Sequence, residues 1–304
     1  MKSHAAAWPA RPLRIVAGGA GGISDIRARW LADRLSPALG QPVVVENNGA
    51  AGGNVGAEQV ARSAPDGYTL LLIHQGTAAV NPHMFAHTGY NPLADFAPIT
   101  RFGYGSLLLS VHPSVPATSV RDVITLAKAK AGGLNYGSPG NGTPPHLAGE
   151  LFMRTAGVTA THVPFKGGGA MMQALLGGHV ACSFEGLTAQ LPHVRAGSLR
   201  AIAVTGPQRA SSLPDVPTIA EAGLAGYEFS GWTGLAAPAA TPRPIVDRLQ
   251  AEIAKIATTD ETRQWFERSG SEPGIQSPQE FGDFIRAEHT RLGKLIREAG
   301  LRAE

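Results

Sequence analysis

The sequence is poor in several features that would reveal a function at once. Cys182 is the only cysteine, so no disulfide can form within the chain and the redox compartment stays undetermined. No stretch approaches the roughly 18 to 20 consecutive apolar residues that a membrane-spanning helix needs. The net charge is only +3, and no basic run is interleaved with aromatic residues, which excludes the usual pattern of a nucleic-acid-binding protein. We therefore expect no nucleic-acid partner and no direct insertion into a membrane.

Motifs of several enzyme and metal-binding classes are missing as well. No Gly-Lys-Ser/Thr of a phosphate-binding Walker loop occurs, and the segment 136–140 lacks the first glycine of a nucleophile elbow. His83 and His87 have the spacing of a helical ligand pair, but no Glu-x-x-His partner accompanies them. Cys182 falls inside a strand pattern, where a thiol acts as a small apolar residue. We therefore expect no catalytic residue, no metal and no cofactor.

The composition that remains is that of an ordinary globular protein. Hydrophobic residues make up 43% and charged residues 16% of the chain, unlike a disordered sequence. A length of 304 residues exceeds one typical domain, so we expect two. Residues 1–7 lack the apolar segment of a signal peptide. We interpret them as an N-terminal extension before a mature start near Trp8, which is consistent with an exported protein.

Strand-like and helix-like segments alternate along the chain. Short apolar strands are expected at 13–16, 43–45 and 69–73, with an amphipathic helix after the first. Alternating strands and helices indicate βαβ units. The sequence thus predicts an α/β protein in which each domain has a mostly parallel sheet flanked by helices. Further strands are expected at 106–111, 161–164, 180–184, 199–204 and 227–235, and further helices at 55–63, 120–130, 144–155 and 168–177 and from about Pro242, Asp260 and Pro278.

Two glycine-rich loops, each between a strand and a helix, are the most informative feature present. The first covers 17–22 and the second 137–143; a third glycine-rich stretch lies at 49–53. Glycine lets the backbone approach a ligand closely, and a helix N-terminus offers unpaired N–H groups and a positive dipole end. The first two loops therefore predict two half-sites that face one cleft. A small acid held at both ends would fit such a cleft.

The candidate ligand-binding residues follow from these loops and from neighbouring strand ends. Asp25 is expected in the first helical turn, where it either caps the helix or contacts a polar group of the ligand. Hydroxyl and amide side chains of the second loop add donors for a carboxylate. The residues after the third strand lie at the carboxyl edge, where α/β sheets hold ligands. The candidates are Gly18, Gly19, Ala20, Gly21, Gly22, Ile23, Ser24, Asp25, His74, Gln75, Thr77, Ser138, Asn141, Gly142, Thr143, Phe165 and Glu185.

Several segments, spread along nearly the whole chain, match one family pattern in order: Gly21–Asp25, Leu39–Asn47, Ala64–Leu71, Gly142–Glu150, Val163–Gly168 and Leu213–Gly223. Together they resemble the Bug-type substrate-binding receptors of bacterial tripartite tricarboxylate transporters. The resemblance implies a type II periplasmic-binding-protein fold, with residues 8–105 plus 226–304 in one domain and 106–225 in the other. It implies a periplasmic receptor that closes over a carboxylated solute and delivers it to membrane permease subunits, without catalysis.

The sequence departs from the family pattern at the expected ligand site. Ala17 and Gly18 stand where the family usually has proline followed by an aromatic residue, and Ala181 and Glu185 stand where it usually has aspartates. The loss of an aromatic side chain at Gly18 should enlarge the site. We therefore hypothesise a larger or aromatic carboxylate in place of a small four-carbon dicarboxylate.

Two alternatives remain open at this point. The segment 19–24 comes near the dinucleotide-binding fingerprint, although Ser24 replaces its third glycine, and Glu46 follows roughly where a ribose-binding acid would lie. These features would fit an NAD-dependent dehydrogenase. The other alternative is a ligand-sensing receptor that docks with a membrane kinase, which the sequence does not distinguish from transport.

Overall fold

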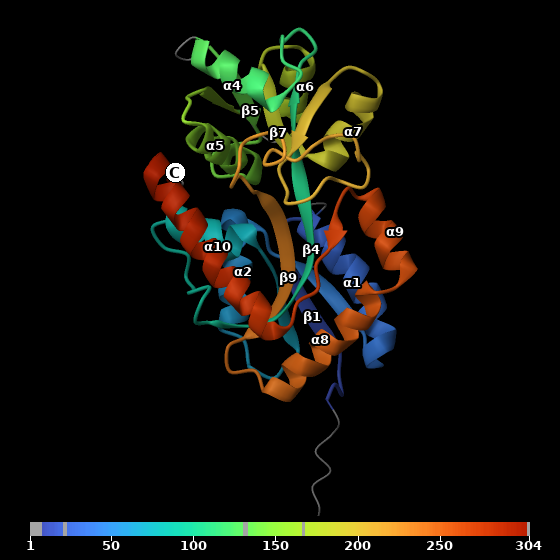
Figure 1. The fold of residues 1–304 in the computed structure, drawn as a ribbon. Helices are drawn as coiled ribbons and strands as arrows, with labels where there is room; N and C mark the ends of the chain where they lie inside the picture. Colours follow the sequence, from blue (N-terminus) through green and yellow to red (C-terminus); the bar gives the residue numbers. More distant parts are fainter. Residues whose placement is uncertain (1–7, 21–22, 130–132, 166–167, 303–304) are drawn as a thin grey trace, which may run out of the picture.

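The computed structural model describes residues 8–20, 23–129, 133–165 and 168–302. The chain folds into two lobes stacked one above the other, each with a sheet flanked by helices (Figure 1). The predicted α/β class with two domains is confirmed. The sheets are mixed, however, because the strands that run between the lobes pair in the antiparallel direction.

The sheet of lobe 1 has the order β2-β1-β3-β9-β4, with the short β10 paired to β4. β1 is parallel to β2 and β3, as expected for βαβ units, whereas β9 is antiparallel to both of its neighbours. Its strands are β1 (Leu13–Ala17), β2 (Val43–Asn47), β3 (Thr69–His74), β9 (Ser230–Pro238), β10 (Glu272–Pro273) and the first part of β4 (Phe96–Val111).

The sheet of lobe 2 begins on the last residues of β4. From Leu107 onward β4 pairs with β7 (Cys182–Gly186) and, from Leu108, with β8 (Arg200–Val204), both antiparallel. β5 (Asn135–Ser138) is parallel to β7 and to β6 (Thr161–Pro164). β4 therefore belongs to both lobes, and β9 leaves it at the Ser106–Ser230 pair.

Helices cover the sheets, and their ends follow the expected capping rules. α10 begins with a capping box between Ser277 and Glu280 with Pro278 at the first turn, and it ends at Gly300 with φ of +66°. The helices are α1 (Ile23–Leu39), α2 (Asn54–Ala61), α3 (Asn81–Met84), α4 (Val120–Ala129), α5 (Pro144–Ala156), α6 (Gly168–Leu176), α7 (Leu187–Arg195), α8 (Arg243–Ala257), α9 (Asp260–Arg268) and α10 (Pro278–Ala299), with short helical turns η1 (Ala50–Gly53) and η2 (Gly76–Val80).

The helix α10 connects the lobes, although the family resemblance implied that it belongs wholly to the first domain. Its first half packs in lobe 1 through Phe281 and Ile285. Its second half packs through Leu292 and Ile296 in a core that contains most of lobe 2. It runs diagonally up to α5 in Figure 1, where α10 and α5 are in contact.

The segment before β9 also packs on lobe 2. The hydroxyl of Tyr227 donates to the Ala148 carbonyl at 3.0 Å, and its ring lies against Phe152. The backbone N–H of Phe229 donates to the Thr205 carbonyl. The chain thus enters lobe 1 a few residues after the expected division at 225/226.

Candidate functional site

The first glycine loop follows β1 and leads into α1. Asn47 donates one amide hydrogen to the Gly18 carbonyl at 2.9 Å and the other to Asp25 Oδ1 at 2.8 Å. Asp25 is buried and also forms an ion pair with Arg29 at 2.8 Å. Through Asn47, Asp25 helps to hold this loop; its two expected roles, as a helix cap or as a ligand contact, stay predictions. Gly21 and Gly22 lie outside the described residues, as does the side chain of Ile23; Gly19 and Ala20 are exposed and Ser24 is half-buried.

The third glycine-rich stretch, residues 49–53, contacts both the first loop and the end of β3. None of its residues was among the predicted ligand-binding residues. A Cβ on Gly49 would lie 2.3 Å from the Gly19 nitrogen, and one on Gly53 would lie 3.2 Å from His74 Nε2. Ala51, Gly52 and Gly53 all have positive φ, a conformation that costs a residue with a side chain about 1–2 kcal/mol. Backbone strain from such sparsely populated conformations is found preferentially at binding sites. The glycine content of 49–53 was the signal that could have identified this loop.

His74 presents a hydrogen-bond donor at the end of β3. Burial lowers its pKa to about 4, so the ring is neutral at physiological pH. Its Nδ1 accepts a hydrogen bond from the Gly76 N–H at 3.1 Å, and the proton therefore resides on Nε2. Thr77 donates its hydroxyl to the His74 carbonyl at 3.1 Å and so holds the turn. A neutral N–H donor of this kind suits an anionic group.

Gln75 has a different environment from its neighbours. Its side-chain amide donates to the Ser230 carbonyl at 3.0 Å and to Glu288 Oε2 at 3.2 Å, and the residue is only 2% exposed. Gln75 thus ties the end of β3 to β9 and α10. Its amide nitrogen is therefore used within the protein, whereas its Oε1 is buried and has no hydrogen-bond partner.

The second glycine loop is held by its own hydroxyl groups. Ser138 is fully buried, with Oγ 3.0 Å from the Gly140 carbonyl oxygen and 2.6 Å from His162 Nε2. Thr143 donates its hydroxyl to the same carbonyl at 2.7 Å. These hydroxyls, expected as ligand donors, here stabilise the loop. Pro144 and Pro145 start α5 and have no N–H group, so the start of this helix lacks two backbone donors. The principal side-chain donor left in the loop is Asn141, which is exposed.

Two histidines of lobe 2 support this loop. The rings of His146 and His162 stack with centroids 3.8 Å apart and planes 9° apart. His146 Nδ1 accepts a hydrogen bond from the Gly142 N–H at 2.9 Å. Burial lowers the pKa of each ring to about 4. The pair is therefore neutral near pH 7 and can stack without repulsion.

The second loop meets lobe 1 at Gly142. A Cβ there would lie 2.4 Å from Met84 Sδ, and Met84 belongs to the same helical segment that begins just after His74. Phe165 adjoins the loop, with its N–H donating to the Ser138 carbonyl at 2.9 Å. The loops of the two lobes therefore border one junction. Glu185, expected just past a strand, lies inside β7 on the same side of lobe 2.

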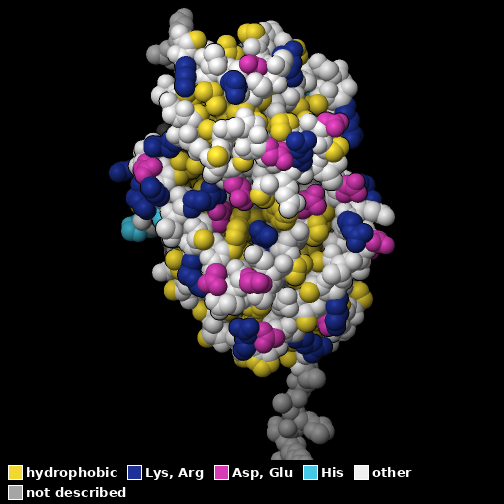
Figure 2. Space-filling model, in the orientation of Figure 1, with side chains coloured by type: hydrophobic (Ala, Val, Ile, Leu, Met, Phe, Trp, Pro, Cys, Tyr) yellow, Lys and Arg dark blue, Asp and Glu magenta, His cyan; other side chains and the backbone are white. Residues whose placement is uncertain are grey.

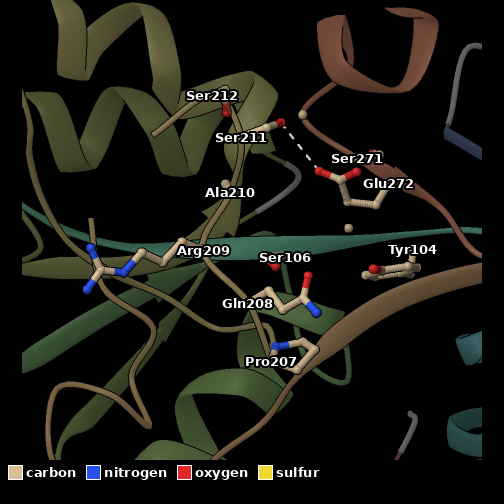
Figure 3. A pocket seen from close by; sticks show the side chains of 12 residues that line it. Tyr104, Ser106, Pro207, Gln208, Arg209, Ala210, Ser211, Ser212, Ser271 and Glu272 are labelled. Carbon is tan, nitrogen blue, oxygen red and sulfur yellow. Dashed lines mark hydrogen bonds between the residues drawn. The ribbon is translucent and has the colours of Figure 1, made fainter. Parts of the chain in front are cut away.

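The face that carries the crossing strands is hollowed between the lobes, with a hydrophobic floor and charged rim (Figure 2). A cavity of about 210 Å³ there includes Arg101, Trp232 and Phe284 among its lining residues. A smaller neighbouring pocket is bridged by a hydrogen bond of 3.3 Å from Ser211 of lobe 2 to Glu272 of lobe 1 (Figure 3). None of the predicted ligand residues that the structure describes lines either cavity.

Comparison with known proteins identifies the family. A model described as "Tripartite tricarboxylate transporter family receptor" matches residues 27–301. The chain belongs to this family. The family consists of solute-binding receptors and not of enzymes. Glu46, which the dehydrogenase alternative required, is engaged with Arg14 at 2.9 Å and Gln59 at 2.8 Å.

Relatives of this receptor match over nearly their whole length. Protein BugT of Bordetella pertussis is 36% identical, covering 96% of this chain and 90% of that protein. The structure of R. palustris Rpa4515 with adipate has a TM-score of 0.83 and 38% identity, covering 97% of this chain and 99% of that one. MatC of Rhodopseudomonas palustris with bound malate has a TM-score of 0.78 and 30% identity, covering 95% and 100%.

Two features are absent from the part of the receptor that the structure describes. None of its helices combines the length and apolarity needed to cross a bilayer. Among the same residues, no group of three or more His, Cys, Asp or Glu side chains is arranged to bind a metal ion.

Proposed function

We propose that this receptor captures a small organic acid between its lobes in the periplasm and delivers it to the permease subunits of a tripartite tricarboxylate transporter. The main support is that two full-length relatives have carboxylic acids, adipate and malate, in their solved structures. The His74 donor and the loops at the lobe junction are consistent with the same chemistry.

The proposed mechanism is closure of the lobes about the strands β4 and β9. A carboxylate would accept hydrogen bonds from His74 Nε2, from the N-terminal turn of α1 and from the second loop, in part through ordered water. Each charge-assisted hydrogen bond contributes roughly 1.5–3 kcal/mol. Several of them, less the cost of closure, would give micromolar binding or tighter.

We further propose a guest larger than a four-carbon diacid. Gly18 presents no side chain to the junction, and a Cβ there would lie 2.6 Å from Ser24 Oγ. An aromatic residue at this position would therefore require Ser24 to move. The Ser24 hydroxyl occupies this space in the structure, and an adipate-sized or aromatic acid would use it once Ser24 turns away.

Thermal shift and calorimetry with succinate, adipate and terephthalate would test these statements. We expect adipate or terephthalate to raise the melting temperature more than succinate. Stabilisation by succinate alone would contradict the larger guest, and no response to any organic acid at millimolar concentration would contradict the receptor function. Uptake into vesicles that contain the permease subunits, with and without the receptor, would test delivery.

A further inference from the structure

The carboxylate of Glu185 is unusual for an anion receptor. Its Oε1 accepts a hydrogen bond from the Gly186 N–H at 2.8 Å. Its Oε2 is buried and has no hydrogen-bond partner, and among the described residues no cation forms an ion pair with it. Burial raises the pKa of this carboxyl above its ordinary value. A buried acceptor left without a donor is energetically unfavourable, which indicates that a donor arrives from outside the protein.

Glu185 lies beside the second glycine loop of lobe 2. β5 and β7 pair in parallel with Gly137 opposite Ser183, so Glu185 is level with the start of the second glycine loop. A Cβ on Gly168, at the start of α6, would lie 3.8 Å from Glu185 Oε2. The residues that follow Glu185 in the chain contact lobe 1.

That contact with lobe 1 involves the start of α7. Thr188 donates its hydroxyl to the Ser269 carbonyl, and a Cβ on Gly270 would lie 3.1 Å from Leu187 Cβ. The end of β7 is therefore directed at the opposite lobe. Glu185 stands immediately before this contact.

Lobe 1 contributes a buried positive charge, that of Arg27. Arg27, in the first half of α1, is 3% exposed. Its guanidinium donates to the Gly103 carbonyl and to the hydroxyls of Thr233 and Ser271, at 2.8–3.3 Å. No carboxylate pairs with it among the described residues. Ser271 follows Gly270, so Arg27 contacts the same turn of lobe 1 that meets Leu187 and Thr188, which follow Glu185 in the chain.

We propose that Glu185 is a specificity-determining residue that accepts a hydrogen bond from a hydroxyl or ammonium group on the guest. The acid end of the guest lies toward lobe 1, beside the α1 terminus and Arg27. A second carboxylate at the lobe-2 end would face Glu185 and be repelled. The preferred guest class is thus a hydroxy or amino acid whose donor group is distant from its carboxylate. This inference rests on the proposed receptor function.

The test uses matched acids that differ only at one end. Adipate and terephthalate are each compared with the two acids of similar length in which one carboxylate is replaced by a hydroxyl or an amino group. Affinities are measured by calorimetry for the unmodified receptor, for Glu185→Gln and for the control Glu221→Gln. Glu221 is an exposed acid of lobe 2 that pairs with Arg209, so its replacement controls for a change of charge on that lobe.

In the unmodified receptor, at least one donor-ended acid should bind about tenfold or more tightly than its diacid, as expected for a hydrogen bond to a charged group. Glu185→Gln should weaken that acid, strengthen the diacid and so reduce the ratio, whereas Glu221→Gln should leave it unchanged. If Glu185 contributed only to folding, its replacement would not change the ratio between the affinities for the donor-ended acid and the diacid. Acids that bind without preference for a donor end, or a ratio that Glu185→Gln does not alter, would overturn this inference alone. Failure of every acid to bind would overturn the receptor function with it.

Discussion

The two glycine loops occupy equivalent places in the two lobes but keep their shapes by different means. The first loop is held by close backbone contact with Gly49, whose Cβ would lie 2.3 Å from the Gly19 nitrogen, and by the Asn47 amide, which lies outside the loop and donates to the Gly18 carbonyl. The second is held by hydroxyls of Ser138 and Thr143 and by a stacked histidine pair. A loop held by backbone contact keeps its polar groups for a ligand, whereas a loop held by its own side chains uses them internally. Similar composition therefore does not imply a similar contribution to binding.

The largest effect is expected at the backbone contact of the first loop. Gly49→Ala places a methyl group against the backbone nitrogen of Gly19, which cannot rotate away. We expect a loss on the order of 3 kcal/mol in the free energy of unfolding, together with loss of acid binding. Urea unfolding measures the first and calorimetry the second. Gly19→Ala is the control for the unfolding measurement, since no described residue lies within 4 Å of a Cβ there; an equal loss of stability in the two variants would refute the close contact.

A smaller effect is expected at Gly142 in the second loop. Its φ is +73°, which costs alanine about 1–2 kcal/mol, but the atom facing its Cβ is the flexible Met84 side chain. Gly142→Ala should therefore lower stability by about that amount and weaken acid binding by disturbing the lobe contact. Denaturant unfolding and calorimetry provide the measurements. A protein with unchanged stability and affinity would show that this contact is dispensable.

The next effect concerns the hydroxyl of Thr143. Thr143→Ala removes the hydrogen bond to the Gly140 carbonyl, a loss of about 1 kcal/mol, and should weaken acid binding several-fold while the protein stays folded. Thr143→Ser, which keeps the hydroxyl, should restore most of the affinity. Affinity that is the same in Thr143→Ala as in the unmodified receptor would remove Thr143 from the site.

A separate prediction concerns pH dependence. The pKa values of His146 and His162 are lowered from 6.5 to about 4 in the folded state. The unfolded chain takes up these protons first as pH falls, so stability is full above 6.5 and declines between pH 6.5 and about 4. His162→Gln should make this decline shallower in thermal melts across that range. The same change at the exposed His87 should have no effect, and an unaltered profile in His162→Gln would exclude the stacked pair as its source.

Most elements could be predicted from the sequence, and the exceptions have physical causes. The predicted strand at 106–111 is only the end of β4, which begins at Phe96. Pro98 and Gly103 interrupt the local strand pattern there, and both lie at register shifts against β9. The turn η2, the helix α3 and α7 were not predicted; the first two are short and begin immediately after β3.

The candidate site could be predicted in outline only. Glycine-rich segments after strands identified both loops, because glycine and strand ends are local signals. Which donors remain for a ligand depends on partners far along the chain, such as His162 for Ser138 and Ser230 for Gln75. No local pattern carries that information.

The sequence by itself determined the family, the alternation of strands and helices and the positions of the glycine loops. Periodicity, turn residues and motif order act over a few residues and survive without any knowledge of the fold. Only the tertiary structure decided that α10 joins both lobes, that the second loop uses its hydroxyls internally and that one carboxylate oxygen of Glu185 is buried without a hydrogen-bond partner. Burial and hydrogen-bond pairing are set by segments that meet only when the chain is folded.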